Sequence, residues 1–461
     1  MMSYYPIQLS ETYIDVVDEN EKPKKDCIKC EIGLNIKFNS SVLEQHFFST
    51  EQPIIEDLLV VAASVEFADR VKKRSHVIWG RYINITIPVF ERQLWEQEET
   101  YNALVETLNF LTGDKWILNF KKRKYKNIKQ TALPMRSNPP KVIMPFSNGL
   151  DSYLVGKLLD LEYGDEVQRV RIGGRAKFSK KSNNPNDRFL LTPFSIYAFN
   201  LPETSVRSRG FKFSILTAIS GYLSNSKDII IPESGQGSLG VALVPVGQIY
   251  PDYRNHPIFL RKVERFINLI LNYNIFYKFP RIWFTKGQTL QAYLNINSSD
   301  SIWTKTKTCW QSSRQSSISG QHRQCGICAA CMLRRLSVYT ARANEPITNY
   351  LWENLKTPKF DQGVVKAMKP SQLKSMSEYA IAGTLHLQDL ADVNKPFYNE
   401  DMLDNTTFKL ANALNEPQPE VRRKLETMLR QHRKKWNDFL NYLGDSSFIS
   451  QWVKREKYYD I

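Results

Sequence analysis

The middle of the chain alternates between short hydrophobic runs and longer stretches with helical periodicity. The hydrophobic runs are residues 142–146, 170–172, 194–199 and 229–232. Continuous hydrophobic strands separated by helices are typical of a parallel sheet that helices cover on both faces. The pattern therefore predicts an α/β domain, which we place at residues 139–340.

The regions on either side of this domain have different patterns. Residues 1–138 mix strand-like and helix-like segments and end in a proline-rich stretch, which marks a boundary. Beyond residue 340 the strand pattern disappears, and one helix face carries Val421, Leu425, Met428, Leu429, Trp436 and Leu440. We therefore expect an α+β amino-terminal extension at 1–138 and a helical carboxy-terminal region at 341–461.

The composition is that of a soluble globular protein and excludes disordered and fibrous classes. Of the 461 residues, 42% are hydrophobic and 24% are charged. No hydrophobic run approaches the ~18 residues that span a bilayer, so we expect no membrane segment. The amino terminus lacks the basic and hydrophobic parts of a secretory signal, which favours a cytoplasmic protein.

The net charge of +16 favours polyanionic partners. Basic residues gather at 121–126 and on the polar face of the helix described above, at Arg422, Arg423, Arg430, Arg433 and Lys434. Either group could bind nucleic acid, but a solvated basic face is the commoner explanation. Nucleic acid is therefore a possible partner that the pattern does not require.

A six-residue loop between a buried strand and a helix has the composition of a phosphate-binding site. It consists of Ser147, Asn148, Gly149, Leu150, Asp151 and Ser152. Backbone N–H groups beside a glycine and at a helix amino terminus attract anions, and the serine hydroxyls can donate to phosphate oxygens. Asp151 would either cap the helix or ligate the Mg²⁺ that accompanies ATP. The same residues also suit an ordinary turn and helix cap.

Four of the six cysteines lie close together in the sequence, at Cys309, Cys325, Cys328 and Cys331. Tetrahedral zinc takes four thiolates, and Cys-x2-Cys spacing supplies two of them from one tight turn. The spacing therefore predicts a closed, structural Zn²⁺ site with no open position for catalysis. We interpret Cys27 and Cys30, a separate pair, as ordinary cysteines without a metal or redox role.

Together, the loop and the cysteines resemble QueC, the 7-cyano-7-deazaguanine synthase family. The loop is similar to the SGGxDS pyrophosphate loop of PP-loop ATPases, with Asn148 in place of a glycine. Arg334 and Arg335 follow the last cysteine, as in that family. The resemblance covers about residues 140–340. It implies the adenine nucleotide alpha hydrolase-like fold, with ATP and Mg²⁺ bound by the loop.

The resemblance also implies roles for individual residues. The segment 205–213 resembles the arginine-rich helix start that approaches the nucleotide, and Arg207 and Arg209 would stabilise charge at the α-phosphate. The catalytic set would then be Ser147, Asp151, Ser152, Arg207 and Arg209. Two further segments resemble parts that line the substrate pocket, which makes Glu233, Gly235, Asp252 and His256 the predicted substrate-binding residues. Ordinary salt bridges for the arginines and a helix cap for Glu233 are the alternatives.

QueC-like enzymes are ATP-dependent ligases that adenylate the carboxyl of 7-carboxy-7-deazaguanine, after which an amine displaces AMP. The long form of this chain, including residues 57–63 and 68–70, resembles the QueC-like proteins of anti-phage defence, such as QatC of Qat operons and the protein of type IV CBASS operons. That resemblance implies a partner protein from the same operon that receives the deazaguanine at its amino terminus. The alternatives are the synthase reaction with ammonia, a tRNA-modifying PP-loop enzyme and a non-catalytic nucleotide-binding scaffold.

Overall fold

The contacts within the chain divide it into two compact units, each built from several segments. Unit 1 comprises Met1–Pro145, Asp160–Ile231 and Asp252–Lys278, and unit 2 comprises Phe146–Leu159, Pro232–Pro251 and Phe279–Ile461. The three-way division at residues 138 and 340 stays a prediction. The structure, a computed structural model, describes residues 11–46, 52–74, 80–123, 139–173, 189–247, 250–297, 300–311, 316–318, 321–366, 368, 370–393 and 400–456.

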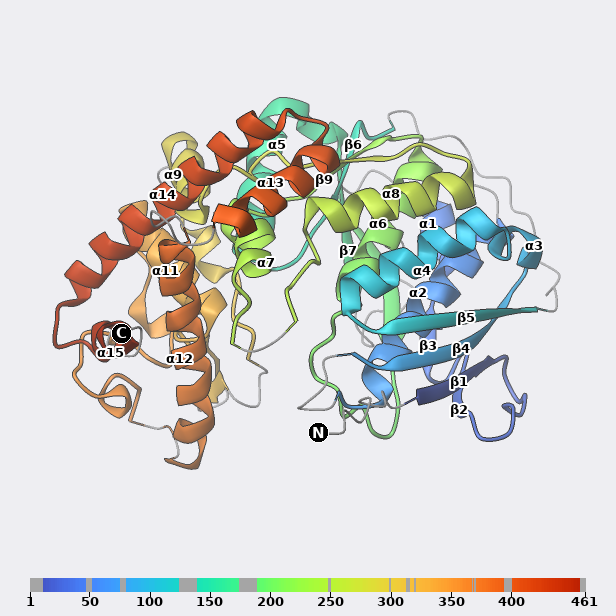
Figure 1. The fold of residues 1–461 in the computed structure, drawn as a ribbon, viewed down its shortest axis with the longest axis horizontal. Coiled ribbons are helices and arrows are strands. Elements are labelled where there is room, and N and C mark those ends of the chain that lie inside the picture. Colours follow the sequence, from blue (N-terminus) through green and yellow to red (C-terminus); the bar gives the residue numbers. More distant parts are fainter. Residues whose placement is uncertain are drawn as a thin grey trace, which may run out of the picture. The chain divides into compact units, whose positions relative to one another are not determined.

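Unit 1 contains a four-stranded parallel sheet built from the amino-terminal part of the chain (Figure 1). Its strand order is β2 (Ile28–Glu31), β1 (Glu11–Val17), β4 (Tyr82–Val89) and β5 (Lys115–Lys122). Helix α4 (Glu98–Thr112) makes the crossover from β4 to β5, with the short α3 (Arg92–Trp95) before it. The α+β expectation for this region was wrong, because all the strand pairs of the sheet are parallel, as in α/β folds.

The second sheet of unit 1 has six strands. Their order is β10 (Phe276–Lys278), β9 (Asp228–Ile230), β6 (Val142–Pro145), β7 (Val167–Gly173), β8 (Phe189–Ile196) and β3 (Ile36–Phe38). All neighbours are parallel except β3, which runs antiparallel to β8. The four predicted hydrophobic runs correspond to β6, β7, β8 and β9, so the parallel sheet is confirmed. The prediction missed β10, whose sequence Phe-Tyr-Lys is not a continuous hydrophobic run.

Helix α2 (Pro53–Val71) contacts elements of both sheets, namely β4, β3 and β8. Nearly all of its residues from Asp57 to Asp69 are buried. A helix that is hydrophobic all round is a buried helix, which explains the continuous run Leu58–Ala63. Helix α6 (Arg209–Ser224) packs on the six-stranded sheet, and α8 (Pro257–Leu271) packs on α6 and α4. The other described elements of the unit are α1 (Ser40–His46) and the 3-10 turn η1 (Gly164–Glu166).

Unit 2 is mainly helical. It contains most of α5 (Leu150–Tyr163), the π-helix η3 (Gln236–Gly240), α7 (Val241–Leu243), α9 (Lys286–Ile296), η4 (Ile302–Lys305), the pair β11 (Ser317–Ile318) and β12 (Gln321–His322), and α11 (Ala329–Thr340). After η5 (Ile347–Asn349) and η6 (Phe360–Gln362) follow the long carboxy-terminal helices α12 (Pro370–Asp392), α13 (Glu400–Leu414), α14 (Gln418–Leu443) and α15 (Phe448–Glu456).

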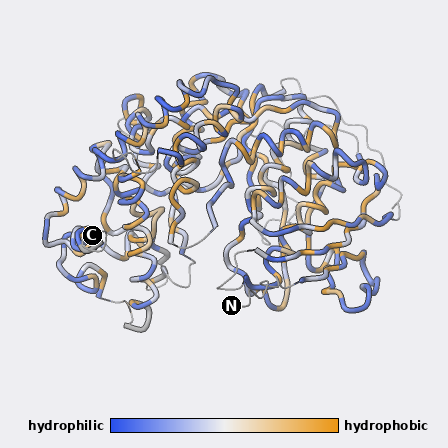
Figure 2. The backbone as a smooth tube through the Cα atoms, in the orientation of Figure 1, coloured by the Kyte–Doolittle hydropathy of each residue, from blue (hydrophilic) through white to orange (hydrophobic). Residues whose placement is uncertain are grey.

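The carboxy-terminal helices bury one face each, and hydrophobic and hydrophilic positions alternate along them in Figure 2. The predicted hydrophobic face of α14 is confirmed, because its members are buried or, for Leu440, partly buried. The helical carboxy-terminal region is thus also confirmed over its described residues. None of the described helices is long and hydrophobic enough to cross a membrane.

The basic runs are partly neutralised where the structure describes them. Lys121 pairs with Asp15, and Arg123 pairs with both Asp18 and Glu56; residues 124–126 of this run lie outside the described part. On α14, Arg422 pairs with Glu400, Asp404 and Glu426. These ion pairs reduce the charge left for a polyanion, and nucleic-acid binding stays a prediction.

Candidate active site and metal centre

The predicted phosphate loop closes on itself through its two serines. The hydroxyls of Ser147 and Ser152 lie 3.0 Å apart, and the Ser147 N–H donates to Ser152 Oγ at 3.2 Å. The Gly149 N–H donates to Ser147 Oγ at 3.1 Å. A Cβ atom on Gly149 would lie 2.9 Å from the same oxygen, so a side chain there would fill the turn. The loop keeps an accessible outer surface, since Ser147 and Asn148 are exposed.

Asn148 fits this loop without backbone strain. It is not among the described residues with a positive φ, so its position does not require a glycine. Its carbonyl oxygen accepts a hydrogen bond from the Lys307 N–H at 2.8 Å. The substitution of asparagine for glycine is therefore compatible with a phosphate-binding conformation of the loop at the amino terminus of α5. Such a helix terminus carries about half a positive charge, which suits an anion.

Asp151 lies in the first turn of α5, and its carboxylate forms a buried ion pair with Lys286. Helix α5 begins at Leu150, and its first backbone hydrogen bond runs from Tyr153 N–H to Gly149 O. Asp151 therefore lies inside the helix and does not cap it. Lys286 Nζ also lies 3.5 Å from Glu233 Oε1. Lys286 thus joins the phosphate loop to the segment that follows β9. The part of Mg²⁺ in binding ATP stays a prediction.

The three charged groups strongly affect one another. Burial raises the pKa of Glu233 to about 8, and the nearby Asp151 carboxylate raises it through its charge and a hydrogen bond between the two side chains. Burial acts to lower the pKa of Lys286, but the two carboxyl groups outweigh it and raise that pKa above its ordinary value. Lys286 is therefore an ammonium at neutral pH, and Glu233 can hold or release a proton near neutrality.

Sequence reasoning missed Lys286 and its neighbour Gln236. Lys286 directly follows Thr285, which caps α9 in a capping box with Gln288. That motif predicts a helix start, and it points Lys286 into the first turn. The backbone N–H of Lys286 donates to Gln236 Oε1 at 2.9 Å. Only the fold shows that Asp151 and Glu233 lie beside this turn.

The four predicted zinc ligands come together in unit 2. The sulfur atoms of Cys309, Cys325, Cys328 and Cys331 all lie within 4.8 Å of one another, and all but Cys309 are buried. Cys325 Sγ and Cys331 Sγ are 3.8 Å apart, which matches the roughly 3.8 Å between thiolates at 2.3 Å from a tetrahedral Zn²⁺. Backbone N–H groups donate to Cys309 Sγ and Cys325 Sγ, as is usual for thiolate ligands. The donor set therefore fits a structural metal such as zinc.

A buried arginine on α11, the helix that contains Cys331, forms hydrogen bonds with the segment before Cys309. Arg334, in α11, pairs with Glu345 at 2.6 Å and donates to the hydroxyls of Thr306 and Thr308. These threonines flank Lys307, whose N–H bonds Asn148 of the phosphate loop. The metal centre and the phosphate loop thus share one short segment, residues 303–309.

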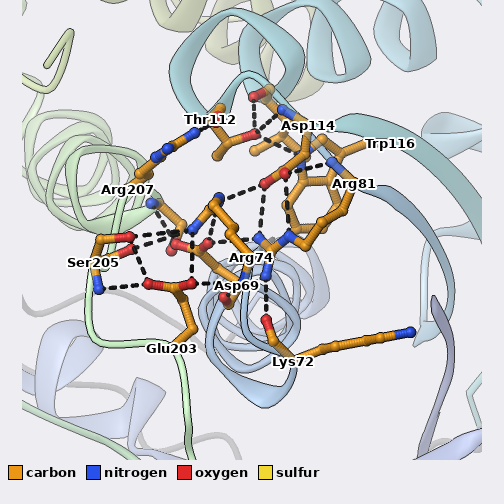
Figure 3. A network of polar contacts seen from close by, with 12 residues as sticks. Asp69, Lys72, Arg74, Arg81, Thr112, Asp114, Trp116, Glu203, Ser205 and Arg207 are labelled. Atoms are coloured by element: carbon orange, nitrogen blue, oxygen red, sulfur yellow. Dashed lines mark hydrogen bonds and ion pairs between the residues drawn. The ribbon is translucent and has the colours of Figure 1, made fainter. Parts of the chain in front are cut away.

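Arg207, which we predicted to be catalytic, belongs to a buried polar network in unit 1 (Figure 3). Its guanidinium donates to the backbone oxygen of Thr112 at 2.7 Å. Burial lowers the pKa of Arg207 to about 10, so it remains charged at neutral pH. Around it are ion pairs at 2.6–3.0 Å among Arg74, Arg81, Asp69 and Asp114. Arg209 is exposed at the start of α6 and lies 5.5 Å from the Phe213 ring centroid.

The other predicted substrate residues also have structural partners. Both carboxylate oxygens of Asp252 accept hydrogen bonds from Arg254 Nε. Burial acts to raise the pKa of Asp252, but the Arg254 guanidinium outweighs it and lowers that pKa below its ordinary value. His256 caps α8 by accepting from Ile258 N–H, and burial lowers its pKa to about 3. Gly235 is needed for packing, since a Cβ atom there would lie 2.2 Å from the backbone oxygen of Ile282. Substrate contact by these three residues, and catalysis by Arg207 and Arg209, stay predictions.

Cys30 is buried in β2, and burial raises its pKa well above the ordinary value. Cys27 is half-buried. Neither belongs to a group of potential metal ligands among the residues that were placed. Their interpretation as ordinary cysteines stays a prediction.

Comparisons with known proteins bear on the part of the chain that contains Glu233, Lys286 and the cysteines. Residues 233–341 match the family described as Queuosine biosynthesis protein QueC, and this range contains Glu233, Lys286 and the four clustered cysteines. Residues 233–341 are QueC-like. A stretch of 136 residues is 29% identical to the 7-cyano-7-deazaguanine synthase of Buchnera aphidicola subsp. Schizaphis graminum (strain Sg). It covers 30% of this chain and 51% of that protein, so the chain spans about half the length of this relative.

Proposed function

We propose that this protein uses ATP to activate the carboxyl group of a 7-deazaguanine, with release of pyrophosphate, and transfers the acyl group to an amine with release of AMP. The observation that carries this proposal is the ion pair between Asp151 and Lys286. Asp151 belongs to the phosphate loop, which lies outside the stretch that matches QueC, and Lys286 lies inside it. This ion pair supports a single site made of the predicted phosphate loop and a QueC-like segment.

The residues present suit the adenylation step. The loop serines and the amino terminus of α5 would bind phosphate oxygens of ATP. The carboxylate of the substrate would attack the α-phosphorus, and the bond to pyrophosphate would break. The positive end of the helix and the Lys286 ammonium would stabilise the charge that develops on the phosphate oxygens. Any contribution from Arg207 and Arg209 would add to these groups.

Glu233 suits recognition of the base. It follows a strand of a parallel sheet, where open α/β sheets bind ligands, and it is partly exposed. Its carboxyl would accept hydrogen bonds from the N–H groups of the deazaguanine, while Lys286 holds it in place. The zinc at the four cysteines would stabilise the fold of residues 303–331 and take no part in the reaction.

For the amine we propose the amino terminus of a partner protein, in an anti-phage system. The support is the size of the chain: residues 1–138 and about 120 residues after the QueC-like stretch lie outside the predicted α/β domain and are available to hold a macromolecule. The second candidate acceptor is ammonia, which would give 7-cyano-7-deazaguanine. It is favoured by the similarity to a protein named as that synthase.

The test is mass spectrometry after incubation with Mg-ATP and 7-carboxy-7-deazaguanine, with and without ammonium. AMP that forms only when the deazaguanine is present supports the proposal. A nitrile product with ammonium identifies the synthase reaction, whereas an adenylate that accumulates until a protein amine is added identifies a protein acceptor. Absence of both AMP and the acyl-adenylate under all these conditions contradicts the proposed activity.

A further inference from the structure

A histidine of the carboxy-terminal helices lies beside the segment that carries Glu233. His432, on α14, is completely buried although it carries two polar nitrogen atoms. Its Nδ1 lies 2.7 Å from Gln236 Nε2, and its Nε2 lies 2.9 Å from the backbone oxygen of Leu387 on α12. Both ring nitrogens therefore have a partner, and one partner belongs to the segment that carries Glu233.

The directions of these hydrogen bonds follow from one another. Gln236 Oε1 accepts from the backbone N–H of Lys286, so the amide nitrogen of Gln236 must face His432 and donate to Nδ1. His432 Nε2 then carries the ring proton and donates to Leu387 O. Burial lowers the pKa of His432 to about 4, which keeps the ring neutral and its Nδ1 an acceptor at neutral pH.

The site at the other end of this chain of bonds is tightly packed. Gln236 begins the π-helix η3, a geometry that often occurs at functional sites. A Cβ atom on Gly237 would lie 2.1 Å from Glu233 Oε1, so the backbone of this turn lies directly against the Glu233 carboxyl. A displacement of Gln236 would therefore disturb both Glu233 and Lys286.

We infer that His432 is a positioning residue, which orients Gln236 so that it holds the Lys286 backbone where the Lys286 ammonium meets Asp151 and Glu233. This gives the carboxy-terminal helices, which lie outside the stretch that matches QueC, a part in assembling the site. The inference concerns the arrangement of the three charged groups, and only its kinetic consequence rests on the proposed function.

Two amide substitutions separate the two bonds of the ring. His432→Asn keeps an acceptor at the place of Nδ1, facing Gln236, whereas His432→Gln keeps a donor at the place of Nε2, facing Leu387. His432→Phe removes both bonds and preserves most of the ring volume. The matched control is Trp436→Phe, one turn further along α14, which removes the bond from Trp436 Nε1 to Gln388 Oε1.

The experiment is a ¹³C NMR titration of protein labelled at glutamate Cδ, with the Glu233 signal assigned by its loss in Glu233→Gln. Thermal unfolding confirms that each variant is folded. In His432→Gln and His432→Phe we expect the Glu233 midpoint to rise by about one pH unit or more, because the nearby ammonium that favours its ionised form is displaced. The Glu233 midpoint in His432→Asn should stay closer to that of the parent protein, and the midpoint in Trp436→Phe should equal that of the parent protein.

Equal midpoints in all variants, or equal shifts in His432→Asn and His432→Gln, would overturn the inference. So would a shift in Trp436→Phe as large as that in His432→Phe. If the parent protein forms AMP, kcat of His432→Gln should fall about tenfold or more, as expected when catalytic groups move by a fraction of an ångström. If the parent forms neither AMP nor the acyl-adenylate, the proposed function fails and the titration still decides the role of His432.

Discussion

Lys286 lies between two carboxyl groups that come from distant parts of the sequence, Asp151 and Glu233. Asp151 was predicted as a site residue from the composition of the phosphate loop, and Glu233 from the resemblance of the segment after β9 to QueC. Lys286 could not be selected, since its local sequence, Thr285 to Gln288, describes only a helix start. Which buried acid meets which buried base depends on the packing of three separate elements. That information is not present in any short motif.

Removal of the Lys286 charge should destabilise the protein in a pH-dependent way. Lys286→Met leaves two carboxyl groups without their cation, and breaking a buried pair costs about 3–5 kcal/mol at neutral pH. The loss should shrink towards pH 5, because the uncompensated acids take up protons in the folded state. Denaturant unfolding at pH 5 and pH 8 measures it, with the exposed Lys434→Met as control. A loss that does not change with pH contradicts the ion-pair assignment.

Glu233 should make the protein less stable as the pH rises. Its folded-state pKa of about 8 lies above the ordinary value of 4.5, so its contribution is complete below pH 4.5 and is lost as the pH rises through 8. Glu233→Gln abolishes this dependence, and its stability relative to the parent should increase between pH 5 and pH 9. Urea unfolding across that range measures the difference, with the exposed Glu378→Gln as control. Parallel curves for parent and Glu233→Gln would exclude a raised pKa.

The cysteine cluster is connected to the phosphate loop by a short segment, residues 303–309. The cysteine spacing was enough to predict that four thiols meet, because a Cys-x2-Cys turn has a fixed geometry. It did not predict that residues 303–309 connect these thiols to Asn148 through Lys307, since that bond joins two backbones. The same limit applies to the network around Asp69, whose partners Arg74, Arg81 and Ser208 come from the segment after α2, the residue before β4 and the segment before α6.

Loss of one zinc ligand should loosen the phosphate loop as well as the cysteine cluster. Cys331→Ser should reduce bound metal from about one ion per chain to a small fraction of that. Amide hydrogen exchange should rise in residues 303–309 and 146–152, which share the bond from Lys307 to Asn148. Metal analysis and exchange mass spectrometry measure the two effects. Cys27→Ser is the matched control, and a metal content unaffected by Cys331→Ser would contradict the assignment.

Asp69 should stabilise unit 1 at neutral pH and not in acid. Burial acts to raise its pKa, but Arg74 and Arg81 outweigh it and lower the pKa below its ordinary value of 3.8. Its contribution is therefore present above pH 3.8 and is lost as the pH falls through the folded-state pKa. Asp69→Asn should cost about 3–5 kcal/mol at pH 7, with a smaller difference in acid. Denaturant unfolding, with exposed Glu99→Gln as control, tests this; a variant as stable as the control at pH 7 would contradict it.

At the scale of the whole molecule, the sequence predicted the kinds of structure but not how they are distributed between the units. Hydrophobic runs identified the parallel strands, and helical periodicity identified α14, because both patterns are local. The predicted segments follow one another along the chain, whereas each compact unit combines several separate segments. The strand β3, from near the amino terminus, pairs with β8 across more than 150 residues. Pairings over such distances leave no periodic signal.

We propose that a single site of this protein activates a carboxyl group with ATP. In the test, 7-carboxy-7-deazaguanine labelled with ¹⁸O in its carboxyl group is incubated with the protein, Mg-ATP and an amine acceptor. Mass spectrometry then measures the mass of the AMP formed. Attack of the carboxylate on the α-phosphorus, followed by attack of the amine on the acyl carbon, leaves one carboxyl oxygen on AMP. We therefore predict AMP that carries one ¹⁸O atom. Unlabelled AMP would show that water attacked the nucleotide, and would contradict the account.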